Sequence, residues 1–501
     1  MVSSGDSVPA GPRNLFALLL TTAGLSLTIT VMGQRLLRER QPALTPKTTP
    51  IQLWQTYRWS VDPLRRREAA LLMAKSSPTL AGQGWGDDPL AAVALALAAE
   101  REQRQGNDAG ADVLWQQLLS RFPETTVSAR ARQHVPGLRQ ELLKLHPSHP
   151  AALATAVALE PTPERGHQGA HHLARWGWRW PGAMDRLKSA CSARKPTPAE
   201  RQSLAWALAM LGAGSSALDC LQGEAAEAET ALAVGRALLR GGEEQHIEGE
   251  QMLLELTQQQ PKSLASDEAV RLLMEPLLPD PARVAAIPPS LAERSAAVAA
   301  AQVRLNAGRG AINVLKRWPD DRDSWQLQWD EARFALLDKQ WERARDLLMA
   351  LPSGTLPPPL EARQLFWLGL SEERTDNSTA ARNHWRRLID THPPGYYRWR
   401  AEVHLGEAKP LHLNKPSTTL PVSEWAPLNS RYQEVNTLWR LGLTEQAWDA
   451  WLSLRDPRDP LAAEEQLVEG RLRLSVDDPW RGLDQLWRPV SYTHLTLPTK
   501  A

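Results

Sequence analysis

Histidines and paired carboxylates are the side chains of this sequence that could do chemistry. His167 and His171 are four residues apart, which puts them on one face of a helix as metal ligation requires, and His172 adjoins them. No HExxH motif or carboxylate-bearing zinc pattern accompanies them, so they predict no metal site. Glu243 and Glu244 are consecutive, and neighbours on a helix point in different directions, which indicates a solvated face rather than an acid/base pair.

Motifs for nucleotides and activated nucleophiles are missing from the sequence. It contains no GxxxxGK(S/T) loop, no GxSxG elbow, and no Rossmann glycine pattern beside a predicted strand. The sequence therefore predicts no catalytic residue, no cofactor and no metal within this chain.

Composition favours an all-α protein without nucleic-acid partners. The 501 residues are rich in Leu and Ala, which form helices well, and include only 4 Phe and 5 Tyr. A chain this long exceeds one compact core, so several domains or a repeat array are expected. The 58 basic and 57 acidic residues leave a net charge of +1, which gives no field that would attract DNA or RNA.

The two cysteines, Cys191 and Cys220, have no metal-ligand spacing. They flank a predicted helix pair, so they could meet in an oxidising compartment. Two buried thiols are the simpler interpretation, and both alternatives stay open at this point.

Residues 15–33 contain no charged side chain and are 19 residues long, or about 28 Å as a helix. That length suits a membrane span and exceeds a typical signal-peptide core, so we expect an uncleaved signal anchor. Residues 1–14 form a polar N-terminal segment. Residues 34–50, with a proline-bearing end and no apolar periodicity, are typical of a tether.

The charged residues on the two sides of the predicted anchor do not determine its orientation in the membrane. Arg13 precedes the apolar run, whereas Arg35, Arg38 and Arg40 follow it, and a positive-inside count would place the following residues in the cytoplasm. Long translocated domains can override such charges, so a periplasmic location stays open.

The body of the chain, residues 51–410, is predicted to be a helical repeat domain. Apolar residues recur there at helical spacing, and a signature of an apolar residue followed five positions later by proline repeats. Proline ends helices, so each signature predicts a helix terminus. Some spacings are 33, 34 or 41 residues, close to a tetratricopeptide period, which predicts an α-superhelix of stacked helix pairs. The signatures are Leu118–Pro123, Leu142–Pro147, Trp176–Pro181, Leu256–Pro261, Val314–Pro319, Leu347–Pro352 and Leu388–Pro393.

Residues 376–407, DNSTAARNHWRRLIDTHPPGYYRWRAEVHLGE, resemble the end of the superhelical domain of soluble lytic murein transglycosylases. The shared pattern is a small residue opening a helix, W-x-x-L, a proline, G-Y-Y, and an alanine followed by L-G. The matching positions are Ala380 or Ala381, Trp385, Leu388, Pro393, Gly395, Tyr396, Tyr397, Ala401, Leu405 and Gly406.

The linker domain of that family has a G-L-x-x-E-A-x-x-E-W turn, and residues 411–489 are expected to form this domain. Gly442, Leu443, Ala447 and Trp451 match the turn, whereas Gln446 and Ala450 stand where the family has Glu. The useful resemblance covers roughly residues 330–489.

The resemblance implies a cell-wall enzyme that cleaves the β-1,4 bond between MurNAc and GlcNAc and forms a 1,6-anhydro product. It implies no cofactor, glycan strands of peptidoglycan as substrate, and an inner-membrane anchor with the bulk of the chain in the periplasm. In the family the superhelix presents the catalytic domain, whose glutamate lies in an E-S-x-F motif followed by G-L-M-Q. Neither motif is present, so the catalytic residues are expected beyond the end of this chain.

The alternative to that enzyme is a membrane-anchored tetratricopeptide-like scaffold that binds proteins or peptides on its concave face without catalysis. The 21 tryptophans could stack on sugars in either case, for example Trp176, Trp178 and Trp180. Large aromatics that fill gaps between helices are the simpler interpretation of them.

Residues 490–501 break the helical pattern with a Thr-rich string. VSYTHLTLPT resembles one translated frame of a transposon-end adapter used in sequencing libraries. We therefore expect an adapter-derived tail after Pro489.

Overall fold

The computed structural model describes residues 43–74, 86, 88–135, 137–161, 167–193, 196–352, 354–407 and 426–493, without the side chains of 74, 89 and 487–493. The predicted anchor at 15–33, the segment 1–14, most of the tether and residues 494–501 lie outside these ranges. None of the described helices is both long enough and apolar enough to cross a membrane.

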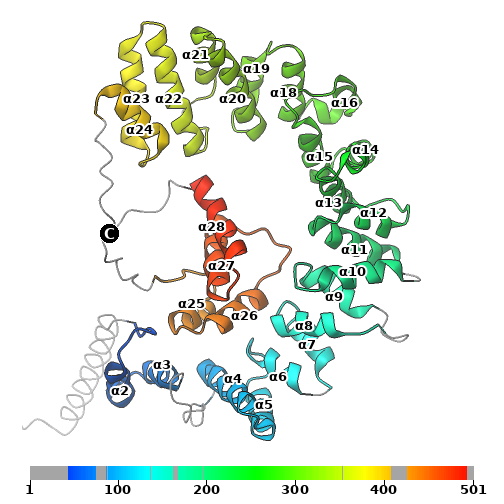
Figure 1. Ribbon diagram of the computed structural model, residues 1–501, viewed down its shortest axis with the longest axis vertical. Helices are drawn as coiled ribbons and strands as arrows, with labels where there is room; N and C mark the ends of the chain where they lie inside the picture. Colours follow the sequence, from blue (N-terminus) through cyan, green and yellow to red (C-terminus); the bar gives the residue numbers. More distant parts are fainter. Residues whose placement is uncertain are drawn as a thin grey trace, which may run out of the picture. The chain divides into compact units, whose positions relative to one another are not determined.

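The regular structure of the described residues is entirely helical (Figure 1). It divides into two units, residues 1–79 and 80–501. The first unit holds α2 (Pro50–Trp59) and α3 (Pro63–Ala74), which pack on each other. Thr49 and Gln52 form a capping box at the start of α2, which satisfies backbone N–H groups left free by the helix.

The second unit contains the remaining helices, which follow one another mostly through short turns. They are α4 (Pro89–Arg104), α5 (Asp108–Arg121), α6 (Ser128–His134), α7 (Arg139–Leu145), α8 (Pro150–Ala158), α9 (Gln168–Trp176), α10 (Ala183–Ser192), α11 (Pro198–Met210), α12 (Gly214–Leu221), α13 (Ala228–Leu238), α14 (Glu243–Gln259), α15 (Leu264–Met274), α16 (Pro281–Ala286), α17 (Pro289–Ala292), α18 (Ala296–Leu305), α19 (Ala311–Arg317), α20 (Arg322–Leu337), α21 (Trp341–Met349), α22 (Pro358–Arg374), α23 (Ser378–Thr391), α24 (Tyr396–Leu405), α25 (Gln433–Arg440), α26 (Thr444–Leu454), α27 (Ala463–Ser475) and α28 (Pro479–Thr493).

The prolines end helices where the signatures predict it. Helices α5, α7, α14, α19, α21 and α23 each end between the apolar residue and the proline of one signature, whereas α9 ends at the apolar residue itself, Trp176, five positions before Pro181. At the signatures that begin at Leu118, Leu142, Leu256, Val314 and Leu388, the N–H four residues later donates to the carbonyl oxygen of the apolar residue, at 2.8–3.2 Å. That bond closes the last turn just before proline would remove a donor.

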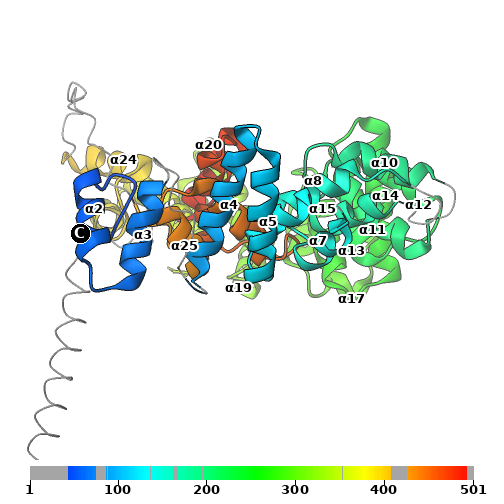
Figure 2. The same cartoon turned by 90° about the horizontal axis from the view of Figure 1, so that it is seen from below.

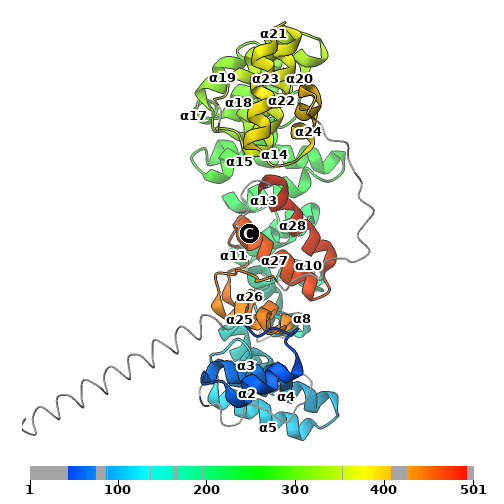
Figure 3. The ribbon, with the colours of Figure 1, turned by 90° about the vertical axis from the view of Figure 1, so that its left-hand side faces the viewer.

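Successive helices bury small and large side chains against each other. Figure 2 shows α4 beside α5, and Figure 3 shows α22 beside α23. A Cβ at Gly369 of α22 would lie 2.4 Å from Nε1 of Trp385 on α23, so only glycine admits this indole. Apolar clusters of this kind follow one another along the array instead of merging into one core.

The two cysteines form a disulfide, which corrects the simpler interpretation of two thiols. Helices α10 and α12 pack together and bring the Cα atoms of Cys191 and Cys220 to 5.0 Å, within bonding range. The sequence could not fix this distance, because it depends on how α10 and α12 pack against α11.

Two predicted boundaries have different outcomes. The boundary at residue 410 lies among residues 408–425, outside the described ranges. The helical pattern was expected to stop after Pro489, but α28 runs to Thr493. Each residue added to an existing helix gains one hydrogen bond, which favours such an extension.

Reduction of the disulfide should destabilise the array. The bridge closes a loop with a sequence separation of 29 residues, and the loss of such a constraint costs roughly 3–4 kcal/mol. We expect thermal unfolding of the full chain to begin at a lower temperature with reductant. The double variant Cys191→Ser/Cys220→Ser should unfold at that lower temperature whether or not reductant is present. Equal unfolding temperatures for the oxidised and the reduced wild-type chain would contradict this prediction.

Candidate functional site

The residues that resemble the transglycosylase superhelix lie together at the end of the array. Trp385, Leu388 and Ala401 are buried with Leu365 and Phe366 in one cluster formed by α22–α24. The Trp385 Nε1–H donates to the carbonyl oxygen of Phe366 at 3.2 Å. These side chains hold three helices together and leave no catalytic group among them.

The rest of this pattern forms the two ends of α24. Pro393 lies in the turn before the helix, and Gly395 is its extended N-cap. Gly406 ends the helix with φ of 73°, a left-handed conformation that glycine adopts without strain. Tyr397 and Leu405 pack against the buried cluster, whereas Tyr396 is 65% exposed.

The residues that resemble the linker turn lie in a separate place, on α25–α26. Gly442 has φ of 69° in the turn, and Leu443, Ala447 and Trp451 are buried after it. The structure thus keeps the two groups of matching residues in two clusters, each with a packing role.

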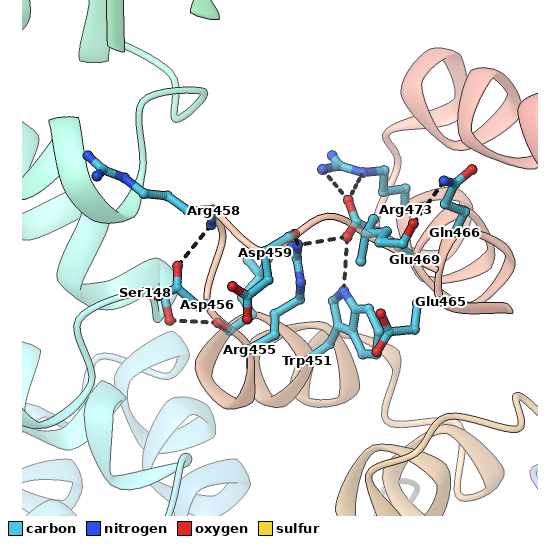
Figure 4. Close-up of polar contacts among 12 residues, drawn as sticks. Ser148, Trp451, Arg455, Asp456, Arg458, Asp459, Glu465, Gln466, Glu469 and Arg473 are labelled. Atoms are coloured by element: carbon cyan, nitrogen blue, oxygen red, sulfur yellow. Dashed lines mark hydrogen bonds and ion pairs between the residues drawn. The ribbon is translucent and has the colours of Figure 1, made fainter. Parts of the chain in front are cut away.

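A buried carboxylate that the sequence did not reveal connects α26 and α27, which together with α25 and α28 we call the linker helices (Figure 4). Glu469 of α27 is 4% exposed and accepts a hydrogen bond from Trp451 Nε1–H at 3.2 Å. Arg455 Nη1 lies 3.4 Å and Arg473 Nη2 lies 2.8 Å from its carboxylate oxygens. The spacing of Glu469 and Arg473 at i,i+4 was the only signal in the sequence.

Helices α25–α26 and the loop after them contact the beginning of the second unit, about 300 residues earlier in the chain. We call this contact the array–linker interface. Its central ion pair joins Arg130 Nη2 to Asp449 Oδ2 at 2.6 Å, and Glu100 Oε1 lies 2.8 Å from Nη1 of the same arginine. Ser148 Oγ–H donates to the carbonyl oxygen of Leu452 at 2.6 Å (Figure 4).

Further polar contacts extend the array–linker interface on both sides of Asp449. Thr126 Oγ1–H donates to Glu434 Oε1 at 2.6 Å, and Arg175 pairs with Asp456. The guanidinium of Arg458 lies 4.5 Å from the ring centroid of Trp206, a favourable cation–π distance.

Burial perturbs the titration of groups at the centre of this interface. It raises the pKa of the Asp449 carboxyl, against the opposite effect of the Arg130 guanidinium. Burial, together with the smaller effect of the nearby Arg130 charge, lowers the pKa of His149 to about 3. His149 is therefore neutral at pH 7; its Nδ1 accepts from the Ala151 N–H, and its Nε2 lies 3.6 Å from Asp449 Oδ2. The residues thus form a structural charge cluster around one buried pair.

An open pocket of about 430 Å³ adjoins the array–linker interface. Its described lining combines indoles, carboxylates and one arginine with a single hydroxyl, that of Ser475, which donates to the Leu472 carbonyl. That hydroxyl is therefore already hydrogen-bonded within its own helix, and the carboxylates of Glu445 and Asp477 are the exposed polar groups among the described lining residues. The lining residues are Arg130, Pro150, Trp180, Glu445, Trp448, Asp449, Ser475, Val476 and Asp477.

The histidine and glutamate candidates of the sequence do not converge. His171 Nε2 lies 3.4 Å from Glu200 Oε1, and His172 Nε2 lies 2.8 Å from the Pro147 carbonyl oxygen. Across the described ranges, no three His, Cys, Asp or Glu side chains are grouped as metal ligands. Glu243 and Glu244 are exposed in the first turn of α14.

The three alternating tryptophans have three different surroundings. Trp178 is buried and meets Trp206 edge to face at 4.9 Å, as expected for a residue that fills a gap between helices. Trp176 stacks under the guanidinium of Arg175 at 4.0 Å. Trp180 is half-buried and lines the pocket, so the sequence pattern alone did not distinguish packing from binding.

Comparison with known proteins identifies one repeat. A tetratricopeptide-repeat family model matches residues 365–394, which lie in α22 and α23 and extend to the turn after them. No curated protein matches the chain. A solved structure described as "Human IFIT1 dimer with PPP-AAAA" is similar over 88% of this chain and 93% of its own, with 12% identity and a TM-score of 0.22. The described residues thus form an all-helical, tetratricopeptide-like array.

Removal of the Asp449 carboxylate should loosen the array–linker interface. Asp449→Ala leaves the half-buried guanidinium of Arg130 with Glu100 as its remaining partner. Removal of one partner of a buried ion pair costs about 3–5 kcal/mol, and the remaining contact with Glu100 favours the lower end of that range. Hydrogen exchange followed by mass spectrometry should show faster exchange in α6 and α26. Asp456→Ala is the matched control, because its more exposed pair with Arg175 contributes about 0–1 kcal/mol. Equal effects of the two variants would refute a special role for Asp449.

Proposed function

We propose that this chain is a helical-repeat scaffold that binds a protein or peptide segment and performs no chemistry of its own. The observation that carries the proposal is the succession of stacked helix pairs, one of which matches the tetratricopeptide repeat. Stacked pairs leave extended faces whose side chains are positioned by the cores behind them, which suits recognition of an extended partner.

The pocket beside the array–linker interface supports binding over catalysis. Its walls come from distant parts of the chain, and the Arg130–Asp449 pair fixes one wall relative to the other. Sites built on such rigid elements lose little entropy when a ligand binds.

We further infer that the bulk of the chain lies in an oxidising compartment, anchored through residues 15–33. The Cys191–Cys220 disulfide supports this location, because cytosolic proteins rarely keep structural disulfides. The periplasm is the oxidising compartment that the resemblance to lytic transglycosylases implies.

The scaffold proposal predicts saturable peptide binding by the full chain. Peptides of about 15 residues selected from a random library should bind with Kd on the order of 1–100 µM. Isothermal titration measures this, and the chain unfolded in urea controls for adhesion to exposed apolar segments. If no peptide binds and the chain instead sediments with purified peptidoglycan sacculi, the scaffold proposal is wrong and a glycan-binding role replaces it.

A second candidate is the superhelical part of a lytic transglycosylase. Two observations favour it: the GYY pattern forms one packed unit on α22–α24, and the linker helices contact the beginning of the array. In this proposal the array and linker helices would position a catalytic domain on glycan strands, and the partners are peptidoglycan and the membrane.

This second candidate predicts a further coding region beyond Pro489 in the source locus. Re-sequencing past that codon should reveal an open frame of roughly 150 further residues with E-S-x-F and G-L-M-Q motifs. A stop codon within a few residues would eliminate the transglycosylase and leave the scaffold.

A further inference from the structure

The pocket beside the array–linker interface has two walls with different roles. Glu445, Trp448 and Asp449 lie at i, i+3 and i+4 on α26 and so share one face of the helix. Beside them, Asp477 follows the end of α27. The second wall, from the beginning of the array, holds the apolar side chains of Trp180 and Pro150.

The charges at the pocket do not cancel. Among the described lining residues Arg130 is the only cation, and both Asp449 and Glu100 lie within 2.8 Å of its nitrogens. Glu445 and Asp477 are exposed, and neither forms an ion pair with a residue in the described ranges. The pocket therefore keeps two carboxylates without a cation.

A second arginine near the pocket, Arg473, already forms ion pairs with other carboxylates. Arg473 lies 5.0 Å from the ring centroid of Trp448, but its nitrogens pair with Glu469 at 2.8 Å and with Asp478 at 2.7 Å. It cannot also neutralise Glu445 and Asp477. Its guanidinium lies at a distance from the Trp448 ring that is typical of cation–π contacts.

We propose that the pocket lined by Trp180, Trp448, Glu445 and Asp477 binds a basic side chain, arginine or lysine, of a partner peptide. The carboxylates would pair with the cation, and the indoles would contact its alkyl stem and charged end. An anionic group would be repelled, and a neutral one would leave both carboxylates uncompensated. The volume of about 430 Å³ lies in the range of small ligand sites. The proposal deepens the proposed scaffold function and rests on it for the nature of the partner.

The test uses the full chain and a probe that isolates the side chain. N-acetyl-arginine methylamide is titrated and followed by saturation-transfer NMR, which detects weak ligands of large proteins. N-acetyl-citrulline methylamide has the same shape without the charge. Its Kd should be at least about tenfold higher than that of the arginine probe. Binding of the arginine probe should also weaken as salt rises from about 0.05 to about 0.5 M.

Variants locate the binding. Glu445→Gln/Asp477→Asn changes two exposed side chains, so the fold is kept, and should weaken arginine binding about tenfold or more. Glu464→Gln is the matched control, because Glu464 is also exposed but lies at the other end of α27; it should bind as the wild type does.

Three results would overturn the proposal. The citrulline probe could bind as tightly as the arginine probe, or the double variant could bind the arginine probe as the wild type does. The third is that a neutral sugar, N-acetylated chitotetraose, displaces the arginine probe as well as unlabelled arginine probe does. The scaffold function fails separately. If the arginine probe binds at this pocket but no library peptide does, the pocket inference stands and the peptide-binding function falls.

Discussion

Each helix pair of the array has apolar faces that it can bury only against the pairs before and after it. This constraint explains why the clusters around α11–α13, α15–α18 and α20–α22 follow one another without a common centre. It also explains the small residues at helix crossings, since Gly369 lets the Trp385 indole reach the backbone of α22. Stability in such an array is close to a sum of neighbouring contacts.

A sum of neighbouring contacts does not join distant parts, and here charged groups make that connection. Arg130 and Asp449 are 319 residues apart, and burial of the aspartate would cost several kcal/mol without its partner. The penalty disfavours arrangements in which the linker helices pack elsewhere or slip by one turn. The Arg130–Asp449 pair therefore fixes where the linker helices pack more than it adds to the free energy of unfolding. The more exposed Arg175–Asp456 pair contributes less to both.

Helix α26 shows how one segment serves packing and recognition together. Ala447, Ala450 and Trp451 are fully buried and join it to its neighbours, whereas Glu445 and Trp448 face the pocket. Because the buried side is fixed by Trp451 and Glu469, the pocket side has little freedom to rearrange. The packing of this buried side therefore fixes the backbone position from which Glu445 and Trp448 reach the pocket.

Local structure could be predicted from the residues alone. Proline removes a backbone donor, so the signatures predicted the helix ends near Leu118, Leu256 and Leu388, and leucine and alanine periodicity predicted the helical class. Only the packing of the helices settled the Cys191–Cys220 bond, the Arg130–Asp449 pair and the division of roles among Trp176, Trp178 and Trp180. Those depend on the angle at which each helix packs on the next, which the summed side-chain volumes of many residues set and no short pattern encodes.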